Sequence, residues 1–215
     1  MGTVYVAPAL LSADFTRLHE VCDAVAVSAD MIHLDIMDGH FGPSLTMGPH
    51  IVSAIRKLTS LPLDVHLMVE NPARFLEVFR AAGANRLAIH WEASQDPLAD
   101  LTRIHQLGAQ AGIAINLDTP VSVLRGVLEI VDYVVILSVD LWDSDHRFNP
   151  SALEKIRKMV AMKGNRVSPQ IEIDGGVTVE TAGLAKLAGA EVLVAGGAVF
   201  QAESPEIGIR CVREA

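Results

Sequence analysis

Residues 32–40, Ile-His-Leu-Asp-Ile-Met-Asp-Gly-His, place an imidazole and a carboxylate two positions apart in an otherwise aliphatic run. The run is typical of a strand that ends in a turn, and successive side chains of a strand point to opposite faces. His33, Asp35 and Met37 therefore share one face, while aliphatic residues form the other. A charged group inside a fold is costly unless another group compensates it, and a metal ion is the simplest such group.

Residues 63–68, Leu-Asp-Val-His-Leu-Met, repeat this pattern with His66 and Met68 on one face, and Asp174 ends a third aliphatic run. The set of two imidazoles and two carboxylates is His33, Asp35, His66 and Asp174. Nitrogen and oxygen ligands of this kind suit one divalent ion such as zinc, manganese or iron, without selecting among them. Each carboxylate could bind the metal through one oxygen and keep the other as a base.

Strands and helices must alternate along the chain to position these side chains. Strands are predicted over residues 4–9, 31–37, 63–68, 86–90, 111–116, 133–139, 170–174 and 192–195. Helices are predicted over residues 14–27, 51–58, 98–107, 121–130, 151–162, 179–188 and 205–213, with another that Asn71 would cap. Eight such units without a linker predict a single-domain (β/α)₈ TIM barrel over residues 1–215. An open doubly wound sheet is the alternative, but no Gly-x-Gly-x-x-Gly follows the first strand.

The active site of such a barrel lies at the carboxyl ends of its strands. Those ends carry Asp35, His66, His90, Asn116, Ser138 and Asp174. Any one of them alone would be better explained as a satisfied core residue or a helix cap. Together at one end of one barrel, they favour a site.

Two glycine pairs follow the last two strands, Gly175-Gly176 and Gly196-Gly197. Backbone N–H groups of these two loops form the usual phosphate site of such barrels. The pairs could equally be tight turns that need positive φ, so alone they are weak support for a phosphate.

The composition limits the partners. The net charge of −9 argues against nucleic acid, because neutralising phosphates needs clustered Lys and Arg. Cys22 and Cys211 lack metal-type spacing and are expected to be reduced thiols. The N-terminus does not resemble a signal peptide, and no apolar run is long enough for a membrane span. A cytoplasmic protein without a membrane partner is expected.

Several motifs resemble the ribulose-phosphate 3-epimerase family of metal-dependent barrels. They are Ala7-Pro8, residues 11–15 (Leu-Ser-Ala-Asp-Phe), residues 33–41 (His-Leu-Asp-Ile-Met-Asp-Gly-His-Phe), residues 64–68 (Asp-Val-His-Leu-Met) and Asp174-Gly175-Gly176. The resemblance implies that His33, Asp35, His66 and Asp174 bind the metal. It also implies that Met37 and Met68 line the site, and that the substrate is a small sugar or sugar phosphate. Members of this family commonly assemble as dimers or hexamers, so a homo-oligomer is expected.

The resemblance also implies a reaction. Asp35 and Asp174 would face opposite sides of the substrate's C3, where one removes the proton and the other returns a proton to the opposite face. The metal would stabilise the enediolate by polarising the C2 carbonyl. His66 and the two glycine pairs would contact the substrate.

The sequence differs from the family at positions that contact the substrate in that family. The family's Asn-Pro-Gly-Phe-Gly-Gly-Gln after the sixth strand is replaced by residues 140–146, Asp-Leu-Trp-Asp-Ser-Asp-His. Three carboxylates thus stand where backbone N–H groups would close over a phosphate, unless this loop is a solvated surface flap. Trp142 could stack on a sugar or lie at a subunit contact. The other changes replace two serines and a methionine with Ala9, Gly197 and Leu137.

Two hypotheses follow. In the first, the protein is an epimerase for a ketose or ketose phosphate that resembles ribulose 5-phosphate but is not that compound, and the glycine loops, helped by Arg147, hold any phosphate. In the second, it is a catalytically weak paralogue that binds a metal and a sugar-like ligand as a sensor or scaffold. The complete His/Asp set favours the first, because a non-catalytic protein has no need for two opposed carboxylates.

Overall fold

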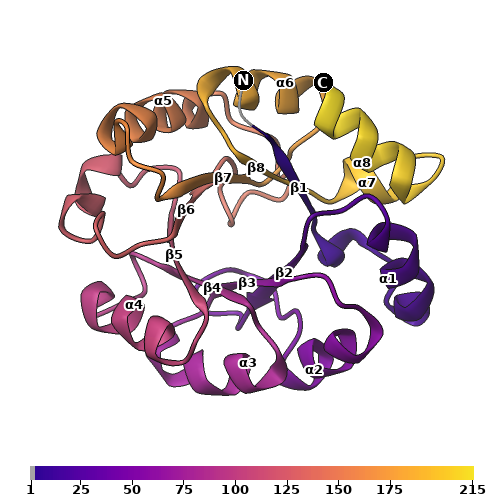
Figure 1. The fold of residues 1–215 in the computed structure, drawn as a ribbon, viewed down its shortest axis with the longest axis horizontal. Coiled ribbons are helices and arrows are strands. Elements are labelled where there is room, and N and C mark those ends of the chain that lie inside the picture. The colour runs from indigo at the N-terminus through magenta and orange to yellow at the C-terminus, as the bar shows by residue number, and fades with distance from the viewer. Residues whose placement is uncertain (1–2) are drawn as a thin grey trace.

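Eight short parallel strands curve into a barrel, and helices surround it in the computed structural model, which describes residues 3–215 (Figure 1). The strands are β1 (Tyr5–Pro8), β2 (Ile32–Met37), β3 (Leu63–Met68), β4 (Arg86–His90), β5 (Gln110–Ile115), β6 (Tyr133–Leu137), β7 (Gln170–Asp174) and β8 (Val192–Ala195). The predicted (β/α)₈ TIM barrel is confirmed.

The helices form the outer ring and connect successive strands. They are α1 (Leu18–Ala26), α2 (Pro49–Leu58), α3 (Leu76–Ala82), α4 (Pro97–Gln106), α5 (Ser151–Lys163), α6 (Val179–Ala188), the single turn α7 (Gly197–Phe200) and α8 (Pro205–Glu214). Between β5 and β6 the connection is a 3₁₀ helix, η4 (Val121–Gly126). Three further 3₁₀ segments are η1 (Leu10–Ser12), η2 (Phe15–Arg17) and η3 (Pro72–Phe75).

The alternation predicted for the strands separates two environments. Leu34 and Ile36 of β2, like Val65 and Leu67 of β3, are buried in the aliphatic core between the sheet and its helices. The alternate side chains of these strands, which include His33, Asp35, Asp64 and His66, point into the barrel. The sheet therefore holds a polar interior inside an aliphatic layer.

The barrel closes unevenly. Seven of its strand pairs form regular parallel ladders, whereas β1 and β2 share a single bridge between Ala9 and His33. We call the boundary between β1 and β2 the seam. Arg213 supports the seam from α8, because its guanidinium donates to Val4 O (3.0 Å) and to Asp30 Oδ2 (2.8 Å).

Some local predictions were wrong. Residues 121–130 form the shorter 3₁₀ helix η4 rather than an α-helix. Asn71 does not cap η3 through its side chain and instead has a left-handed backbone with φ of 52°. At the start of α5, Asn149 Oδ1 accepts a hydrogen bond from Ser151 N (3.0 Å). Asp96 and Thr178 cap α4 and α6 through their side chains.

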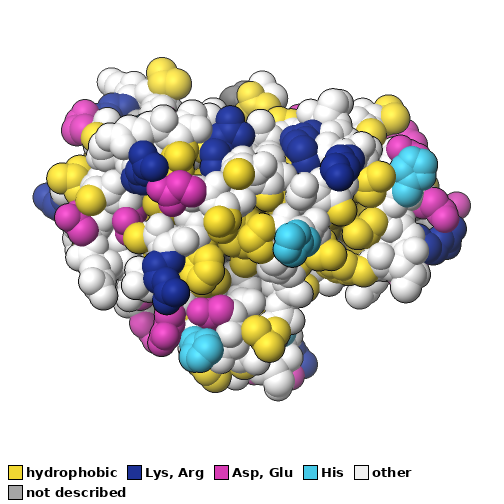
Figure 2. Space-filling view, turned by 90° about the horizontal axis from the view of Figure 1, so that it is seen from below, with side chains coloured by type: hydrophobic (Ala, Val, Ile, Leu, Met, Phe, Trp, Pro, Cys, Tyr) yellow, Lys and Arg dark blue, Asp and Glu magenta, His cyan; other side chains and the backbone are white. Residues whose placement is uncertain are grey.

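The outer surface mixes side-chain types. On the face formed by the helices at the bottom of Figure 1, hydrophobic side chains gather across the middle with Lys and Arg around them (Figure 2). In the part of the chain that the structure describes, no helix combines the length and the apolar character that crossing a bilayer requires.

Candidate active site

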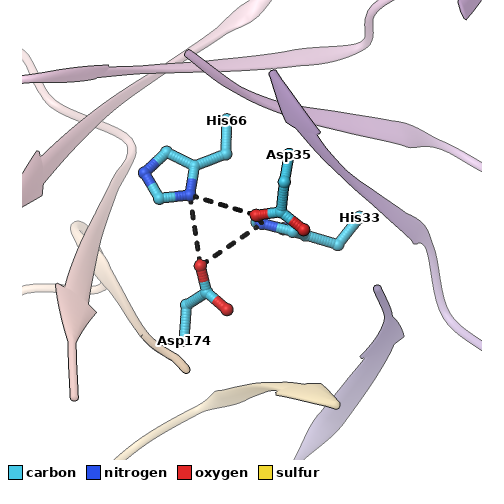
Figure 3. Close-up of side chains that lie close together, drawn as sticks. All are labelled: His33, Asp35, His66 and Asp174. Atoms are coloured by element: carbon cyan, nitrogen blue, oxygen red, sulfur yellow. Dashed lines mark hydrogen bonds and ion pairs between the residues drawn. The ribbon is translucent and has the colours of Figure 1, made fainter. Parts of the chain in front are cut away.

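The four residues predicted to form a metal site come together inside the barrel (Figure 3). Asp35 and His66 are register partners on β2 and β3, and Asp174 ends β7 on another side of the barrel. His66 Nδ1 lies 3.2 Å from Asp174 Oδ2, and His33 Nε2 lies 3.3 Å from Asp35 Oδ1. One potential ligand atom from each residue lies within 4.8 Å of the others, so this group could hold a metal ion.

The chemistry of the group fits a cation. His33 is fully buried, and its Nε2 has no hydrogen-bond partner although it faces two carboxylates. Burial disfavours a charged imidazole, but the Asp35 carboxylate, helped by Asp174 and Asp64, outweighs it and holds the pKa of His33 well above its ordinary value. Burial likewise opposes ionisation of Asp174, but the imidazoles of His33 and His66 outweigh it and lower the pKa of this carboxyl. The site therefore attracts positive charge to the position between its carboxylates.

The other nitrogen of His33 contacts a buried ionic network beneath the site. Its Nδ1 lies 2.8 Å from Asp64 Oδ2. Arg86 joins Asp64 to Glu172, with its Nε 3.2 Å from Asp64 Oδ1 and its Nη2 2.7 Å from Glu172 Oε2. The Tyr133 ring covers the guanidinium, 3.8 Å from its central carbon. This arrangement orients the His33 ring, as a carboxylate behind a metal-bound imidazole does.

His33, Asp64 and Glu172 form a second buried group with spacing suited to a metal. Arg86 already supplies a positive charge between the two carboxylates. Burial raises the pKa of Glu172 to about 7, whereas the pKa of Asp64 is lowered, because the Arg86 and His33 charges overcome its burial. We therefore assign this group to an ion-pair network.

Sequence reasoning missed the roles of Asp64, Arg86 and Glu172. Strand alternation could have revealed them, because Asp64 precedes His66 by two positions and Glu172 precedes Asp174 by two. Each therefore points into the barrel, one layer below the metal group.

His66 also has a neighbour behind it. Its Nε2 lies 2.9 Å from His90 Nε2, and His90 Nδ1 lies 3.1 Å from Glu92 Oε2. Burial lowers the pKa of His90 to about 4. Burial would raise the pKa of Glu92, but hydrogen bonds with His90, Thr119 and Asn116 lower it to about 2. His90 was expected at the site from its strand end, whereas Glu92 was not.

A cavity of about 780 Å³ opens above the carboxylates. Asp35 and Asp174 lie at its base, and neither imidazole of the metal group lines it. Its wall includes the predicted substrate-contacting residues Met37, Met68, Gly175, Gly176, Gly196 and Gly197, together with Ala9 and Leu137. Both residues of the first glycine pair have positive φ, but Gly196 has φ of −96°. Positive φ therefore explains only the first pair.

The divergent loop contributes fewer carboxylates to the cavity than its sequence suggests. Asp145 lines the cavity with His146 and Arg147. The side chains of Asp140 and Asp143 accept hydrogen bonds from backbone N–H groups of their own turns and are exposed. Trp142 is 64% exposed and does not line the cavity. Leu141, Asp145 and His146 thus line the cavity, while Asp140, Trp142 and Asp143 form an exposed flap beside it.

Two other polar residues near strand ends, Ser138 and Asn116, contact neighbours of the predicted metal site. Ser138 Oγ donates to the carbonyl oxygens of Asp174 and Gly175, which fixes the end of β7. Asn116 N donates to Glu92 Oε1 (2.8 Å). Both residues position neighbours of the metal group.

Comparisons with known proteins agree with this architecture. A sequence model of the ribulose-phosphate 3 epimerase family matches residues 5–200. The chain is 44% identical over 200 residues to a protein named ribulose-phosphate 3-epimerase from Bacillus subtilis, covering 92% of each chain. It is 42% identical over 214 residues to a protein of the same name from Synechocystis, covering 98% of this chain and 93% of the relative.

Solved structures with low sequence identity share the fold. A structure titled KGPDC from Streptococcus mutans superposes with a TM-score of 0.73 at 14% identity, covering 99% of this chain and 97% of that chain. A mutant tryptophan synthase alpha-subunit from Pyrococcus furiosus gives a TM-score of 0.68 at 17% identity, covering 98% and 96%. At these identities the likeness shows the barrel alone. The family match and the curated relatives go further: the chain belongs to the ribulose-phosphate 3-epimerase family.

Proposed function

We propose that this chain is a metal-dependent isomerase that inverts C3 of a ketose phosphate of the ribulose 5-phosphate type. The observation that carries the proposal is the placement of two carboxylates, from β2 and β7, at the base of one cavity. Asp35 and Asp174 each direct one oxygen toward the buried imidazoles. Their second oxygens are free of such contacts and can exchange a proton with a ligand.

These carboxylates can perform the two halves of an inversion. One accepts the proton from C3, and the other donates a proton to the opposite face of the same carbon. The imidazoles of His33 and His66 lower the pKa of Asp174 and keep its carboxyl ionised, which is the form that can accept a proton. Met37 and Met68 supply polarisable, apolar walls beside the carboxylates.

The group of His33, Asp35, His66 and Asp174 would hold the divalent ion. Its donor set suits zinc, manganese or iron. When bound, the ion supplies positive charge beside the oxygen that becomes negative as C3 loses its proton. His33 is oriented for this role by Asp64.

The glycine loops would bind the phosphate. Gly176, Gly197 and Arg147 all line the cavity. Because only one loop carboxylate reaches the cavity, charge repulsion against a phosphate is smaller than the sequence of residues 140–146 suggests. The relatives named as ribulose-phosphate 3-epimerases support a phosphorylated ketose. By the same resemblance we expect a homo-oligomer in the cytoplasm.

The alternative of a weakly catalytic sensor or scaffold is not favoured. A binding protein needs the metal group but has no use for carboxylates that reach one cavity from two separate strands.

Deuterium uptake at C3 tests the proposal. The metal-loaded protein is incubated in D₂O with ribulose 5-phosphate and with other ketoses, with and without phosphate. We expect exchange and inversion with a phosphorylated ketose, and slower exchange without the phosphate. Asp174→Asn should lower turnover by about 100- to 10,000-fold, because it removes a proton-transfer group, while keeping some bound metal.

Asp143→Asn is the matched control, because Asp143 is an exposed carboxylate outside the cavity. Its turnover should equal that of the wild type. Absence of exchange with every ketose, or wild-type turnover in Asp174→Asn, would contradict the proposed reaction.

A further inference from the structure

A chain of polar side chains runs from the metal group toward the surface. It begins at His66 on β3, passes to His90 on β4 and ends at Glu92 in the following loop. The two contacts are 2.9 Å, between His66 Nε2 and His90 Nε2, and 3.1 Å, between His90 Nδ1 and Glu92 Oε2. Both imidazoles are fully buried, and their ring planes are inclined by only 15° with centroids 5.0 Å apart. No step of the proposed reaction uses His90 or Glu92.

The ionised carboxylate of Glu92 determines which atom donates in each hydrogen bond of this series. A carboxylate can only accept, so the proton of the His90–Glu92 bond belongs to His90 Nδ1. A neutral imidazole carries one ring proton, so His90 Nε2 must accept. The donor opposite it is then His66 Nε2–H. This leaves a lone pair on His66 Nδ1, directed toward Asp35 and Asp174. Nδ1 and Asp174 Oδ2, which lie 3.2 Å apart, would then share a bound metal ion and not a proton.

We propose that His90 and Glu92 are positioning residues that hold His66 in the one tautomer able to bind a metal ion. This inference rests on the metal site of the proposed function. Both proposed imidazole ligands would then be oriented by a carboxylate. His33 has the carboxylate of Asp64 directly behind it, whereas His66 has the carboxylate of Glu92 behind an intervening imidazole.

Glu92→Gln tests the inference, because it replaces one carboxylate oxygen of Glu92 with an amide nitrogen while two donors hold the other oxygen in place. Its Oε1 accepts from Asn116 N–H (2.8 Å) and from Thr119 Oγ1. The backbone N–H of Asn116 can only donate, so in Glu92→Gln the amide oxygen stays on that side and the NH₂ group faces His90 Nδ1. The order of donors then reverses along the chain. His90 Nε2 gains the proton, and His66 must either accept it and protonate Nδ1 or lose this bond.

Zinc binding to the metal-free protein is the first measurement, made by competition with a chromophoric chelator. Glu92→Gln should bind zinc about 10- to 100-fold more weakly than the wild type, the usual cost of losing a partner behind a metal ligand. Thr119→Val is the matched control, because it removes a bond to the other oxygen of Glu92 and leaves the His90 contact in place. Its affinity should stay close to that of the wild type.

The second measurement is ¹⁵N NMR of the histidine rings in the zinc-loaded wild type. The proton of His90 should be on Nδ1, and that of His66 on Nε2. A His90 proton on Nε2, or wild-type zinc affinity in Glu92→Gln, would overturn the inference. If Glu92→Gln does not fold, the wild-type spectrum alone decides. Neither measurement uses substrate, so the outcome is independent of whether the protein epimerises a ketose.

Discussion

Lys155 of α5 shows how burial changes the chemistry of a single residue. Its ammonium group is buried and donates to the carbonyl oxygens of Asn116 and Leu117 at the end of β5. Desolvation lowers its pKa to about 8, although Glu92 and Asp118 partly offset the effect. The folded protein therefore holds this proton less tightly than the unfolded chain does.

This shift predicts a pH dependence of stability. Between the folded pKa of about 8 and the ordinary value of 10.5, the unfolded chain binds more protons at this site, so stability rises with pH. The free energy of unfolding of the wild type should rise relative to Lys155→Met, by up to about 1.4 kcal/mol per pH unit. Urea denaturation of both proteins from pH 7.5 to 10 measures the difference.

Lys158→Met is the control, because Lys158 lies on the same helix but is exposed. Its difference from the wild type should be constant over this range. A constant difference for Lys155→Met as well would show that Lys155 is not desolvated.

The strand pattern was sufficient to predict that His33, Asp35, His66 and Asp174 come together, because an imidazole or carboxylate at alternate positions points into the barrel. It could also have revealed Asp64 behind His33, but it could not reveal Glu92 or Arg86. Glu92 contacts His90 from a loop, where no fixed alternation applies. Arg86 stands at the start of a strand, and only the closed barrel brings its long side chain to Asp64 and Glu172.

At the scale of elements, the loop after β7 supports the divergent loop after β6. Gly176 has φ of +61°, and a Cβ at this position would lie 2.5 Å from Phe148 N and 2.8 Å from His146 O. These contacts involve backbone atoms, so a larger residue must displace residues 146–148. Those residues line the cavity beside the proposed phosphate position.

Gly176→Ala should therefore weaken substrate binding more than it weakens the proton transfer itself. We expect a raised KM for the phosphorylated ketose with a smaller change in kcat, and a loss of stability of about 1–3 kcal/mol from the crowding. Gly126→Ala is the control, because a Cβ there meets no atom within 4 Å. If Gly176→Ala kept the wild-type KM, the two loops would not be coupled.

The order and type of most elements followed from periodicity, since long aliphatic runs and spaced apolar residues have few alternatives. The segments that periodicity did not predict correctly are short. The segment η4 repeats Val and Leu at spacings that suit either helix type, and Pro120 and Gly126 limit its length. The sequence left open whether the acidic loop faces a phosphate or forms a surface flap. Carboxylates in turns readily bind their own backbone N–H groups, and sequence alone does not show which they do.

At the scale of the whole molecule, the seam is where the barrel has the fewest strand-to-strand hydrogen bonds. Arg213 of α8 joins the chain on both sides of it, through Val4 O, Ser28 O and Asp30. Asp30 Oδ2 in turn accepts from Val6 N (2.8 Å). The C-terminal helix thus closes the ring that the N-terminal strand begins.

Arg213→Ala should destabilise the protein by about 1–2 kcal/mol, a value reduced by the partial exposure of the ion pair. Thermal unfolding and urea denaturation measure this loss. Arg210→Ala, on the exposed side of the same helix, should change stability little. Equal effects of the two substitutions would mean that Arg213 does not hold the seam.

The positions of the proposed metal ligands around the barrel have a consequence for its stability. β2 and β3 lie on one side of the seam and β7 on the other, beyond β1 and β8. An ion shared by His33, His66 and Asp174 would therefore act as a clamp that bridges the weakest boundary of the ring from within. Occupancy of the site would then lower the rate at which the ring opens at the seam, and the rate of cleavage by a protease with and without the ion would measure this.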